Sequence, residues 1–182
     1  LPPVSADYST GRAIPVAGDA ENRFAYVESF ASLERCFLDD AFLEECLASL
    51  PELPLEVSVD PPDLLAHARG QALADVLWFR SGRIPAVPDG VCRPESADVV
   101  EEVLRVCSSA GVPVIPWGGG TSVTGGVNVL EGDAPVISLD LARLAGLVDL
   151  DEASGLATLG PGTLGPAVEQ ALAGHELTLG HF

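Results

Sequence analysis

The pattern of apolar positions predicts helices and short strands along most of the chain. Apolar residues recur every three or four positions over 24–49, and again over 60–80 with an interruption near Gly70. This spacing is typical of amphipathic helices. Acidic residues would line the solvent-facing side of the first helix. We therefore interpret residues 1–84 as a mainly helical N-terminal extension.

The apolar runs of residues 85–182 are shorter and are separated by glycine and proline. Strands are expected over 90–93 and 112–115, on either side of a helix that begins after the N-cap Ser96 and ends at Gly111. Such a unit has parallel strands and a right-handed connection. Further strands are expected over 135–139, 147–151, 156–159 and 177–179, with a hairpin joining the second and third of these and a short helix over 167–173. The predicted fold class is α+β.

The most informative segment follows the strand at 112–115. From Gly118 to Gly126 there are five glycines and three hydroxyl residues in nine positions. A ligand can approach a glycine backbone closely because glycine has no Cβ, and successive N–H groups can form a concavity that binds an anion. No acidic residue occurs from Val103 to Leu130. We predict a phosphate-binding loop, and the alternative is a flexible surface loop.

Two common phosphate-binding loops do not fit this segment. A Walker loop needs a lysine that reaches the phosphates, and all nine basic residues of this chain are arginine. A Rossmann fingerprint has the form G-x-G-x-x-G and opens a helix. Here Val123 takes the place of the third glycine, and a second expected strand follows the loop. The expected cradle therefore lies between two strands and relies on backbone donors.

The segment Pro116-Trp-Gly-Gly-Gly-Thr-Ser-Val-Thr-Gly-Gly126 resembles the pyrophosphate loop of the FAD-linked oxidases. This is the flavoprotein superfamily of vanillyl-alcohol oxidase and para-cresol methylhydroxylase (PCMH). Residues 80–94, 136–144 and 177–182 resemble neighbouring segments of the same domain. His67-Ala-Arg-Gly-Gln71 is most similar to the branch of alkylglycerone-phosphate synthase, which is close to the D-2-hydroxy-acid dehydrogenases.

The resemblance implies that residues 85–182 are the first α/β part of a PCMH-type FAD-binding domain, within an N-terminal fragment of a longer protein. It implies non-covalent FAD, since the loop lacks the histidine through which some members attach flavin. The catalytic residues are unknown and are expected beyond Phe182. The implied cofactor-binding residues are Pro116, Trp117, Gly118, Gly119, Gly120, Thr121, Ser122, Thr124 and Gly125.

Three functions stay open at this point. The chain is the FAD-binding part of a flavin-dependent oxidoreductase acting on a small hydroxy acid, or of an alkylglycerone-phosphate synthase-like enzyme that exchanges an acyl for an alkyl group in ether-lipid synthesis. The third alternative is a truncated, non-enzymatic flavin-fold module. In the two enzymatic cases the substrate is a small molecule, and a homodimer of the full-length protein is expected.

Composition excludes several other classes of protein. The formal net charge of −18 argues against nucleic-acid binding, which needs a basic surface. No apolar run approaches the roughly 20 residues that cross a bilayer, and the N-terminus shows no secretion signal, so a cytoplasmic location is expected. The cysteines and histidines lack metal-ligand spacing, so no metal site is expected.

The remaining candidate residues are expected to have structural roles. Cys92 and Cys107 are predicted to be buried free thiols. His67 and Arg69 are expected to pack or to form hydrogen bonds, His175 to be exposed, and His181 to be structural. Asp149 and Asp151 share a face of one expected strand, but with 27 acidic residues in the chain chance explains this pair better than a catalytic role.

Overall fold

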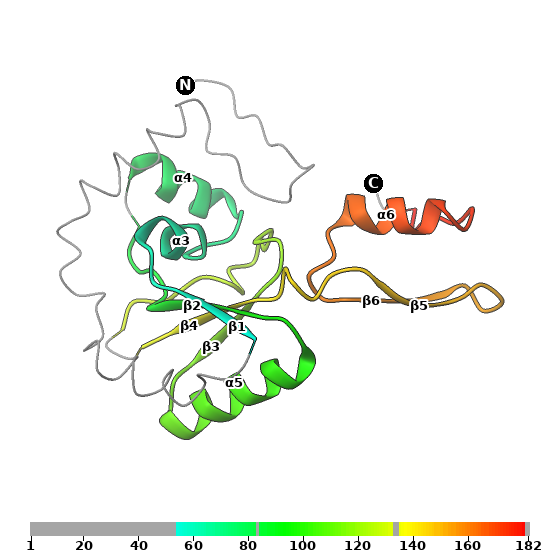
Figure 1. Cartoon of the computed structure of the whole chain (residues 1–182). Coiled ribbons are helices and arrows are strands. Elements are labelled where there is room, and N and C mark those ends of the chain that lie inside the picture. Colours follow the sequence, from blue (N-terminus) through cyan, green and yellow to red (C-terminus); the bar gives the residue numbers. More distant parts are fainter. Residues whose placement is uncertain (1–53, 83, 133–134, 181–182) are drawn as a thin grey trace.

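The computed structural model describes residues 54–82, 84–132 and 135–180. It shows a sheet with helices on both faces, from which a two-stranded hairpin and a helix project at one end (Figure 1). This arrangement confirms the expected mixture of helices and sheet. The helix expected over 24–49 lies outside the described residues. No helix in the described part of the chain is long and apolar enough to cross a membrane.

The main sheet has four strands in the spatial order β1-β2-β4-β3. β1 runs antiparallel to β2, whereas β2 and β3 each pair with β4 in parallel. The strands are β1 (Leu55–Ser58), β2 (Gly90–Pro94), β3 (Val114–Trp117) and β4 (Ile137–Asp140). The predicted parallel orientation of β2 and β3 is therefore correct, but β4 separates them.

The composition of the strands explains why β4 is central and β3 lies at the edge. All four residues of β4 are buried, as suits a strand with neighbours on both sides. β3 contains Pro116, which has no N–H to donate and is tolerated in edge strands. The sequence pattern identified both strands but could not give their order.

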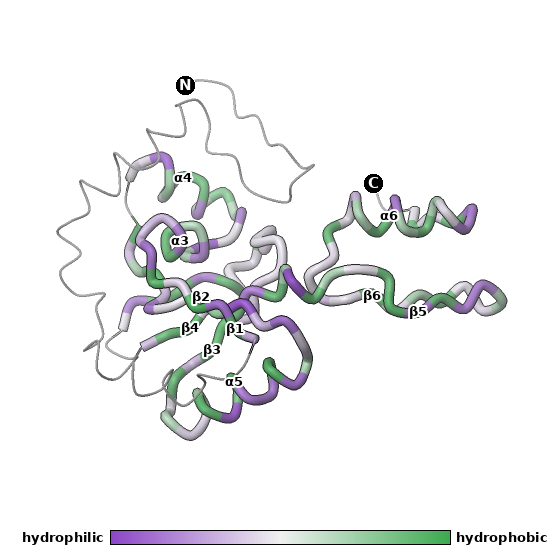
Figure 2. Tube along the Cα trace, viewed as in Figure 1, coloured by the Kyte–Doolittle hydropathy of each residue, from purple (hydrophilic) through white to green (hydrophobic). Residues whose placement is uncertain are grey.

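Side chains alternate between the two faces of the sheet. One face is apolar and is covered by α5 (Ala97–Ala110), whose Val99, Val103 and Cys107 pack against the strands. Figure 2 shows this helix alternating between hydrophobic and hydrophilic residues. The other face of the sheet carries Glu56, Arg93, Trp117 and Asp140, which the strand pairing places next to each other in two pairs. α3 (Pro61–Ala66) and α4 (Leu73–Ser81) lie on that side (Figure 1).

The ends of α5 are those expected from the sequence. The Ser96 Oγ accepts a hydrogen bond from the Val99 N–H at 3.3 Å, and Gly111 ends the helix in the left-handed conformation with φ 71°. Only glycine adopts that conformation without strain. Both terminal signals are local, which is why the sequence located this helix well.

Two differences from the expected elements concern strands. β1 was not expected, although it belongs to the same sheet as β2 and precedes the boundary expected at residues 84–85, whose position stays a prediction. The strand expected over 177–179 is absent from the described residues. There the Leu177 N–H donates to the Leu172 carbonyl at 3.1 Å, and the Leu179 N–H donates to Glu169 at 3.2 Å. The segment is therefore bonded to the preceding helix rather than to a strand.

The projecting part consists of β5 (Leu147–Asp151), β6 (Leu156–Leu159) and α6 (Gly165–Ala173). The two strands form the expected antiparallel hairpin. At its turn, Asp151 accepts a hydrogen bond from the Ser154 Oγ at 2.6 Å. The Asp149–Asp151 pair thus lies on an exposed hairpin, and Asp151 stabilises the turn.

Candidate functional site

The glycine-rich loop begins directly after Trp117, the last residue of β3. Trp117 is buried, whereas Gly118, Thr121 and Thr124 are exposed. None of the backbone N–H groups from Gly118 to Gly125 donates a hydrogen bond to another described residue. Eight successive backbone donors are thus without a protein acceptor among the described residues, as in loops that bind anions.

The indole ring of Trp117 supports the loop from below. Gly120 has a φ of 68°, and a Cβ at this residue would lie 2.5 Å from the Cζ2 atom of Trp117. Position 120 therefore requires glycine both for its backbone conformation and for its contact with the indole. Trp117, one of the predicted cofactor-binding residues, packs beneath the loop.

The loop is also bound from the outside by residues 67–72, which we term the α3–α4 connection. The Gln71 N–H donates to the Ser122 carbonyl at 2.7 Å, and the Val129 N–H donates to the Ala68 carbonyl at 3.0 Å. The Gly70 N–H donates to the Oδ1 of Asn128 at 2.9 Å. The first bond fixes the middle of the loop and the other two fix the segment directly after it, without using the N–H groups of residues 118–125.

A buried carboxylate, Asp75, holds the α3–α4 connection and the loop together. Its side chain accepts from the Arg69 Nη1 at 2.9 Å, from the Asn128 Nδ2 at 2.8 Å and from the Ala72 N–H at 3.2 Å. The Arg69 guanidinium also lies over the ring of Trp78, 5.7 Å from its centroid. The predicted hydrogen-bonding role of Arg69 is confirmed.

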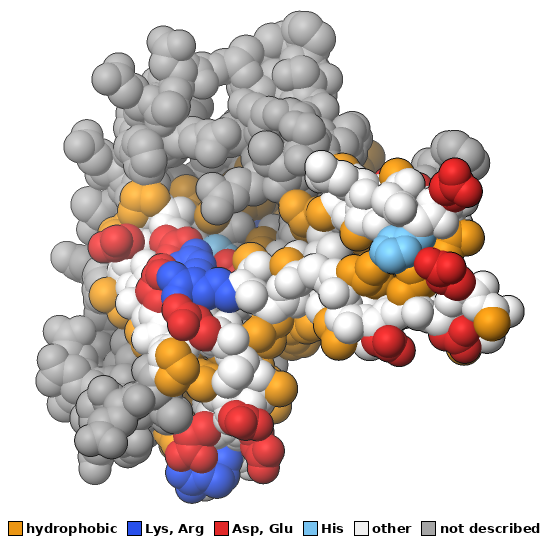
Figure 3. All heavy atoms as spheres, turned by 45° about the vertical axis from the view of Figure 1, so that its right-hand side comes forward, with side chains coloured by type: hydrophobic (Ala, Val, Ile, Leu, Met, Phe, Trp, Pro, Cys, Tyr) orange, Lys and Arg blue, Asp and Glu red, His pale blue; other side chains and the backbone are white. Residues whose placement is uncertain are grey.

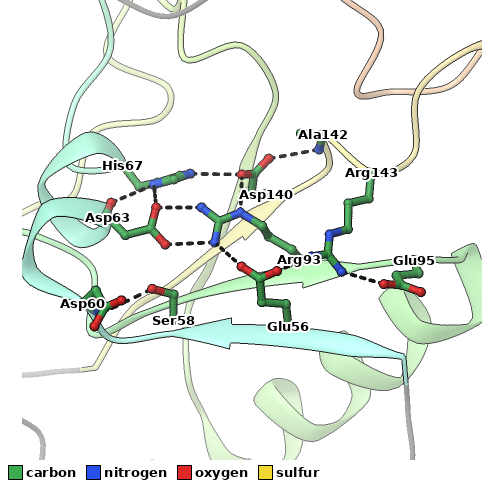
Figure 4. Close-up of polar contacts among 10 residues, drawn as sticks. All are labelled: Glu56, Ser58, Asp60, Asp63, His67, Arg93, Glu95, Asp140, Ala142 and Arg143. Atoms are coloured by element: carbon green, nitrogen blue, oxygen red, sulfur yellow. Dashed lines mark hydrogen bonds and ion pairs between the residues drawn. The ribbon is translucent and has the colours of Figure 1, made fainter.

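His67 packs against Trp117, the residue that supports the loop. Its Nδ1 is 2.8 Å from the Asp63 carbonyl oxygen and its Nε2 is 3.2 Å from the Asp140 Oδ2. Its ring centroid is 4.8 Å from that of Trp117, with the two planes tilted by 49°. Figure 4 shows the His67 ring between the side chains of Asp63 and Asp140. The predicted packing or hydrogen-bonding role of His67 is confirmed.

Arg93 joins the acidic groups of this cluster. It forms a forked contact with the Asp63 carboxylate at 2.8 and 2.6 Å. Its Nε donates to Asp140 at 3.0 Å and its Nη1 to Glu56 at 3.1 Å. In Figure 4 the Arg93 guanidinium lies at the centre of these carboxylates. The helix α3 is thereby tied to three strands of the sheet.

These contacts perturb the ionisation of the cluster. Burial raises the pKa of Asp63, but hydrogen bonds from Arg93 and Ser58 and the Arg93 charge outweigh it, so that pKa lies below its usual value. Burial likewise raises the pKa of Asp140, and hydrogen bonds from His67 and the Ala142 N–H outweigh it. The hydrogen bonds to Asp63 raise the pKa of Arg93. Both carboxylates are therefore ionised at neutral pH.

Of the predicted cofactor-binding residues, Pro116 and Trp117 end β3, and the others lie in the segment between β3 and β4. Pro116 is exposed in β3, and the Ser122 Oγ accepts from the Gly126 N–H at 3.1 Å. Four residues that hold the loop and the neighbouring acidic cluster were not predicted from the sequence: Asp75, Arg93, Asn128 and Asp140. A signal existed for Asp140, since Ile137, Ser138, Leu139 and Asp140 alternate between apolar and polar. An alternating strand implies a polar face that needs partners.

The other candidates behave as expected where the structure describes them. Cys92 and Cys107 are buried and not bonded in a disulfide, and burial raises the pKa of Cys92 to about 12. His175 is exposed and pairs with Glu152 at 3.0 Å, whereas His181 lies outside the described residues. Within the described ranges, no group of three or more His, Cys, Asp or Glu side chains is placed to hold a metal ion.

Comparison with known proteins gives one family and several relatives. A family model described as an FAD binding domain matches residues 88–182. Alkyldihydroxyacetonephosphate synthase from Trypanosoma brucei brucei is 34% identical over 128 residues, which is 69% of this chain and 21% of that protein. Glycolate oxidase subunit GlcD from Bacillus subtilis (strain 168) is 30% identical over 79 residues, which is 43% of this chain and 16% of that protein.

Solved structures show the same fold. A structure of alkyldihydroxyacetonephosphate synthase aligns with a TM-score of 0.65 at 22% identity, covering 99% of this chain and 30% of that chain. The 4-ethylphenol oxidase from Gulosibacter chungangensis aligns with a TM-score of 0.54 at 17% identity, covering 90% and 26% respectively. The family match and these alignments confirm the PCMH-type FAD-binding fold. The chain spans about a fifth of the length of the alkyldihydroxyacetonephosphate synthases that it matches.

Proposed function

Since this chain belongs to the FAD binding domain family, we propose that the loop from Gly118 to Gly125 binds the pyrophosphate of its FAD cofactor. The observation that carries this proposal is the run of loop N–H groups without an acceptor among the described residues. Hydrogen bonds to a charged group contribute roughly 1.5–3 kcal/mol each. Three or four such bonds would give the loop substantial affinity for a diphosphate.

The electrostatics around the loop are compatible with an anionic ligand. The loop itself has no acidic residue. The two buried carboxylates close to it are both paired, Asp75 with Arg69 and Asp140 with Arg93 and His67. Figure 3 shows basic side chains set among acidic ones on the visible face. This pairing reduces the repulsion that the net charge of the chain would otherwise exert on a phosphate group.

The chemistry of the longer protein is part of the same proposal. Bound FAD supplies the redox chemistry, and the protein supplies placement and polarity. We favour an alkyldihydroxyacetonephosphate synthase-like enzyme, because the match to that synthase covers 69% of the chain, against 43% for the glycolate oxidase subunit. Oxidation of a small hydroxy acid is the second candidate, and a non-enzymatic flavin-fold module is the third. A cytoplasmic location and a homodimer of the full-length protein stay predictions.

FAD titration of the purified chain tests the proposal. Protein mixed with FAD should quench flavin fluorescence and should keep the yellow colour through gel filtration. Gly119→Asp places a carboxylate within the cradle and should abolish binding; Gly119 has an ordinary negative φ, so backbone strain does not complicate the result. Gly165→Asp is the matched control, because a Cβ at exposed Gly165 meets nothing within 4 Å.

Two results would contradict the loop assignment. One is a wild-type chain that takes up no FAD, and the other is a Gly119→Asp variant that binds FAD as the wild type does. Acid precipitation separates the modes of attachment. A non-covalent flavin is released into the supernatant, as we propose for a loop without histidine, whereas a covalent flavin stays with the protein.

A further inference from the structure

We propose that His67 is a positioning residue for the FAD loop and that it acts as a doubly protonated imidazolium. This inference rests on the proposed function of the loop and deepens it. His67 precedes the part of the chain that the FAD binding domain model matches. Its contacts nevertheless reach the loop through the side chain of Trp117.

Both ring nitrogens of His67 face hydrogen-bond acceptors. The Nδ1 faces the main-chain carbonyl oxygen of Asp63, which can only accept, and the Nε2 faces the ionised carboxylate of Asp140. Both bonds form only when each nitrogen carries a proton. A neutral ring would direct a nitrogen lone pair at one of these oxygens, so it would lose one bond and gain a repulsion.

The charged groups around the ring also favour a protonated His67. The groups that face His67 are Asp63 from α3, Asp140 from β4 and the uncharged Trp117 from β3. Arg93 from β2 contacts both carboxylates, and Glu56 from β1 reaches the cluster only through Arg93. Glu56 is also paired with Arg143, which in turn pairs with Glu95. In this cluster the carboxylates outnumber the guanidinium groups, and the excess of negative charge favours a protonated His67.

Trp117 connects His67 to the loop. The imidazolium lies within the range of a cation–π contact with the Trp117 ring. The indole in turn packs against the loop backbone at Gly120, where an added Cβ would lie 2.5 Å from the ring. Because N–H groups bind an anion well only when they converge on it, the orientation of Trp117 affects the affinity for FAD.

The experiment follows Trp117 and FAD binding as functions of pH. Trp78→Phe leaves Trp117 as the sole tryptophan of the chain, and this variant serves as the background. When the pH is raised until His67 loses its proton, we expect FAD binding to weaken and the Trp117 fluorescence of the FAD-free protein to change over the same pH range. Adding His67→Gln should weaken FAD binding at pH 6 about tenfold, as expected for one charged hydrogen bond, and should remove both pH dependences.

The matched control is His175→Gln, which removes an exposed histidine of the projecting part and should leave both pH profiles unchanged. Equal pH profiles for the background and for His67→Gln would overturn the proposal, because a purely structural histidine lowers stability without setting the pH dependence. A background protein that binds no FAD at any pH would instead refute the proposed function. In that case the Trp117 fluorescence of the FAD-free protein still decides whether His67 controls the ring.

A second measurement needs no substitution and so does not depend on the variant's folding. Nitrogen-15 NMR of the histidine side chains distinguishes a ring with two protonated nitrogens from either neutral tautomer. We expect the resonances of His67 to show protons on both nitrogens at pH 7. A single protonated nitrogen at that pH would overturn the proposal.

Discussion

The α-carbon of Gly70 lies against the backbone carbonyl of Ser122, so that a Cβ at residue 70 would be 2.3 Å from the carbonyl oxygen. The neighbouring Gln71 N–H donates to the same oxygen at 2.7 Å. This contact joins the α3–α4 connection to the FAD loop, 52 residues further along the chain. A glycine upstream of the segment that the FAD binding domain model matches thus packs directly against the loop.

We predict that Gly70→Ala displaces the loop. The added Cβ would clash with the backbone of Ser122, which a rotamer change cannot relieve. The free energy of unfolding should therefore fall by about 1–3 kcal/mol, the usual cost of overpacking. FAD affinity should fall with it. Urea unfolding and FAD titration measure the two effects. Gly165→Ala adds the same methyl group in open space and should leave both quantities close to wild type; equal behaviour of the two variants would contradict the prediction.

A double-mutant cycle tests the contact between Gly120 and Trp117. Gly120→Ala should be destabilising for two reasons: its positive φ costs about 1–2 kcal/mol for a residue with a Cβ, and its methyl group meets the indole at 2.5 Å. Trp117→Leu removes the obstacle but not the φ penalty. The double variant should therefore be more stable than the sum of the single effects predicts. Thermal unfolding of all four proteins checks this, and additivity within about 0.5 kcal/mol would show that the contact is unimportant.

The acid cluster predicts loss of stability at low pH. Asp63 and Asp140 have pKa values below the usual 3.8 in the folded protein. Their contribution is thus complete above about pH 4 and is lost as the pH falls through the lowered values. Arg93→Gln removes a partner of both carboxylates, so burial should raise their pKa values; stability at pH 7 should fall, and less stability should be lost as the pH is lowered. Urea unfolding at pH 2.5–7 measures the shift.

The control for this experiment is Arg105→Gln. Arg105 pairs with Glu102 on the exposed surface of α5, where solvent screens the charges. Its removal should leave the pH dependence as in the wild type. If Arg93→Gln and Arg105→Gln gave the same profile, the cluster could not be the origin of the acid sensitivity.

A charge swap tests the link between Asp75 and Asn128. Asn128→Asp replaces the Nδ2 donor, 2.8 Å from Asp75, by a second carboxylate. Stability should fall by about 1–3 kcal/mol, the cost of leaving a buried polar group unpaired. Adding Asp75→Asn restores one donor and one acceptor and should recover much of the loss. Chemical unfolding of the three proteins provides the measurement, and no recovery would refute the pairing.

Much of the secondary structure was predictable because its signals are local. Ser96 and Gly111 mark the ends of α5, and alternating residues mark the hairpin of β5 and β6. The glycine run identified the loop because glycine is needed wherever a ligand or a ring approaches the backbone. The strand expected over 177–179 was wrong since a strand requires a pairing partner, and local apolar character does not supply one.

The sequence by itself determined most of the helices and strands of the described residues, that the loop follows β3, and that the loop has no acidic residue. Only the tertiary structure decided that β4 separates β2 from β3, that β1 joins them, and that His67 lies behind Trp117 and Asp75 beside Asn128. The reason is physical. Local periodicity sets the direction of a side chain within its own element, whereas its partner depends on how distant segments pack against each other.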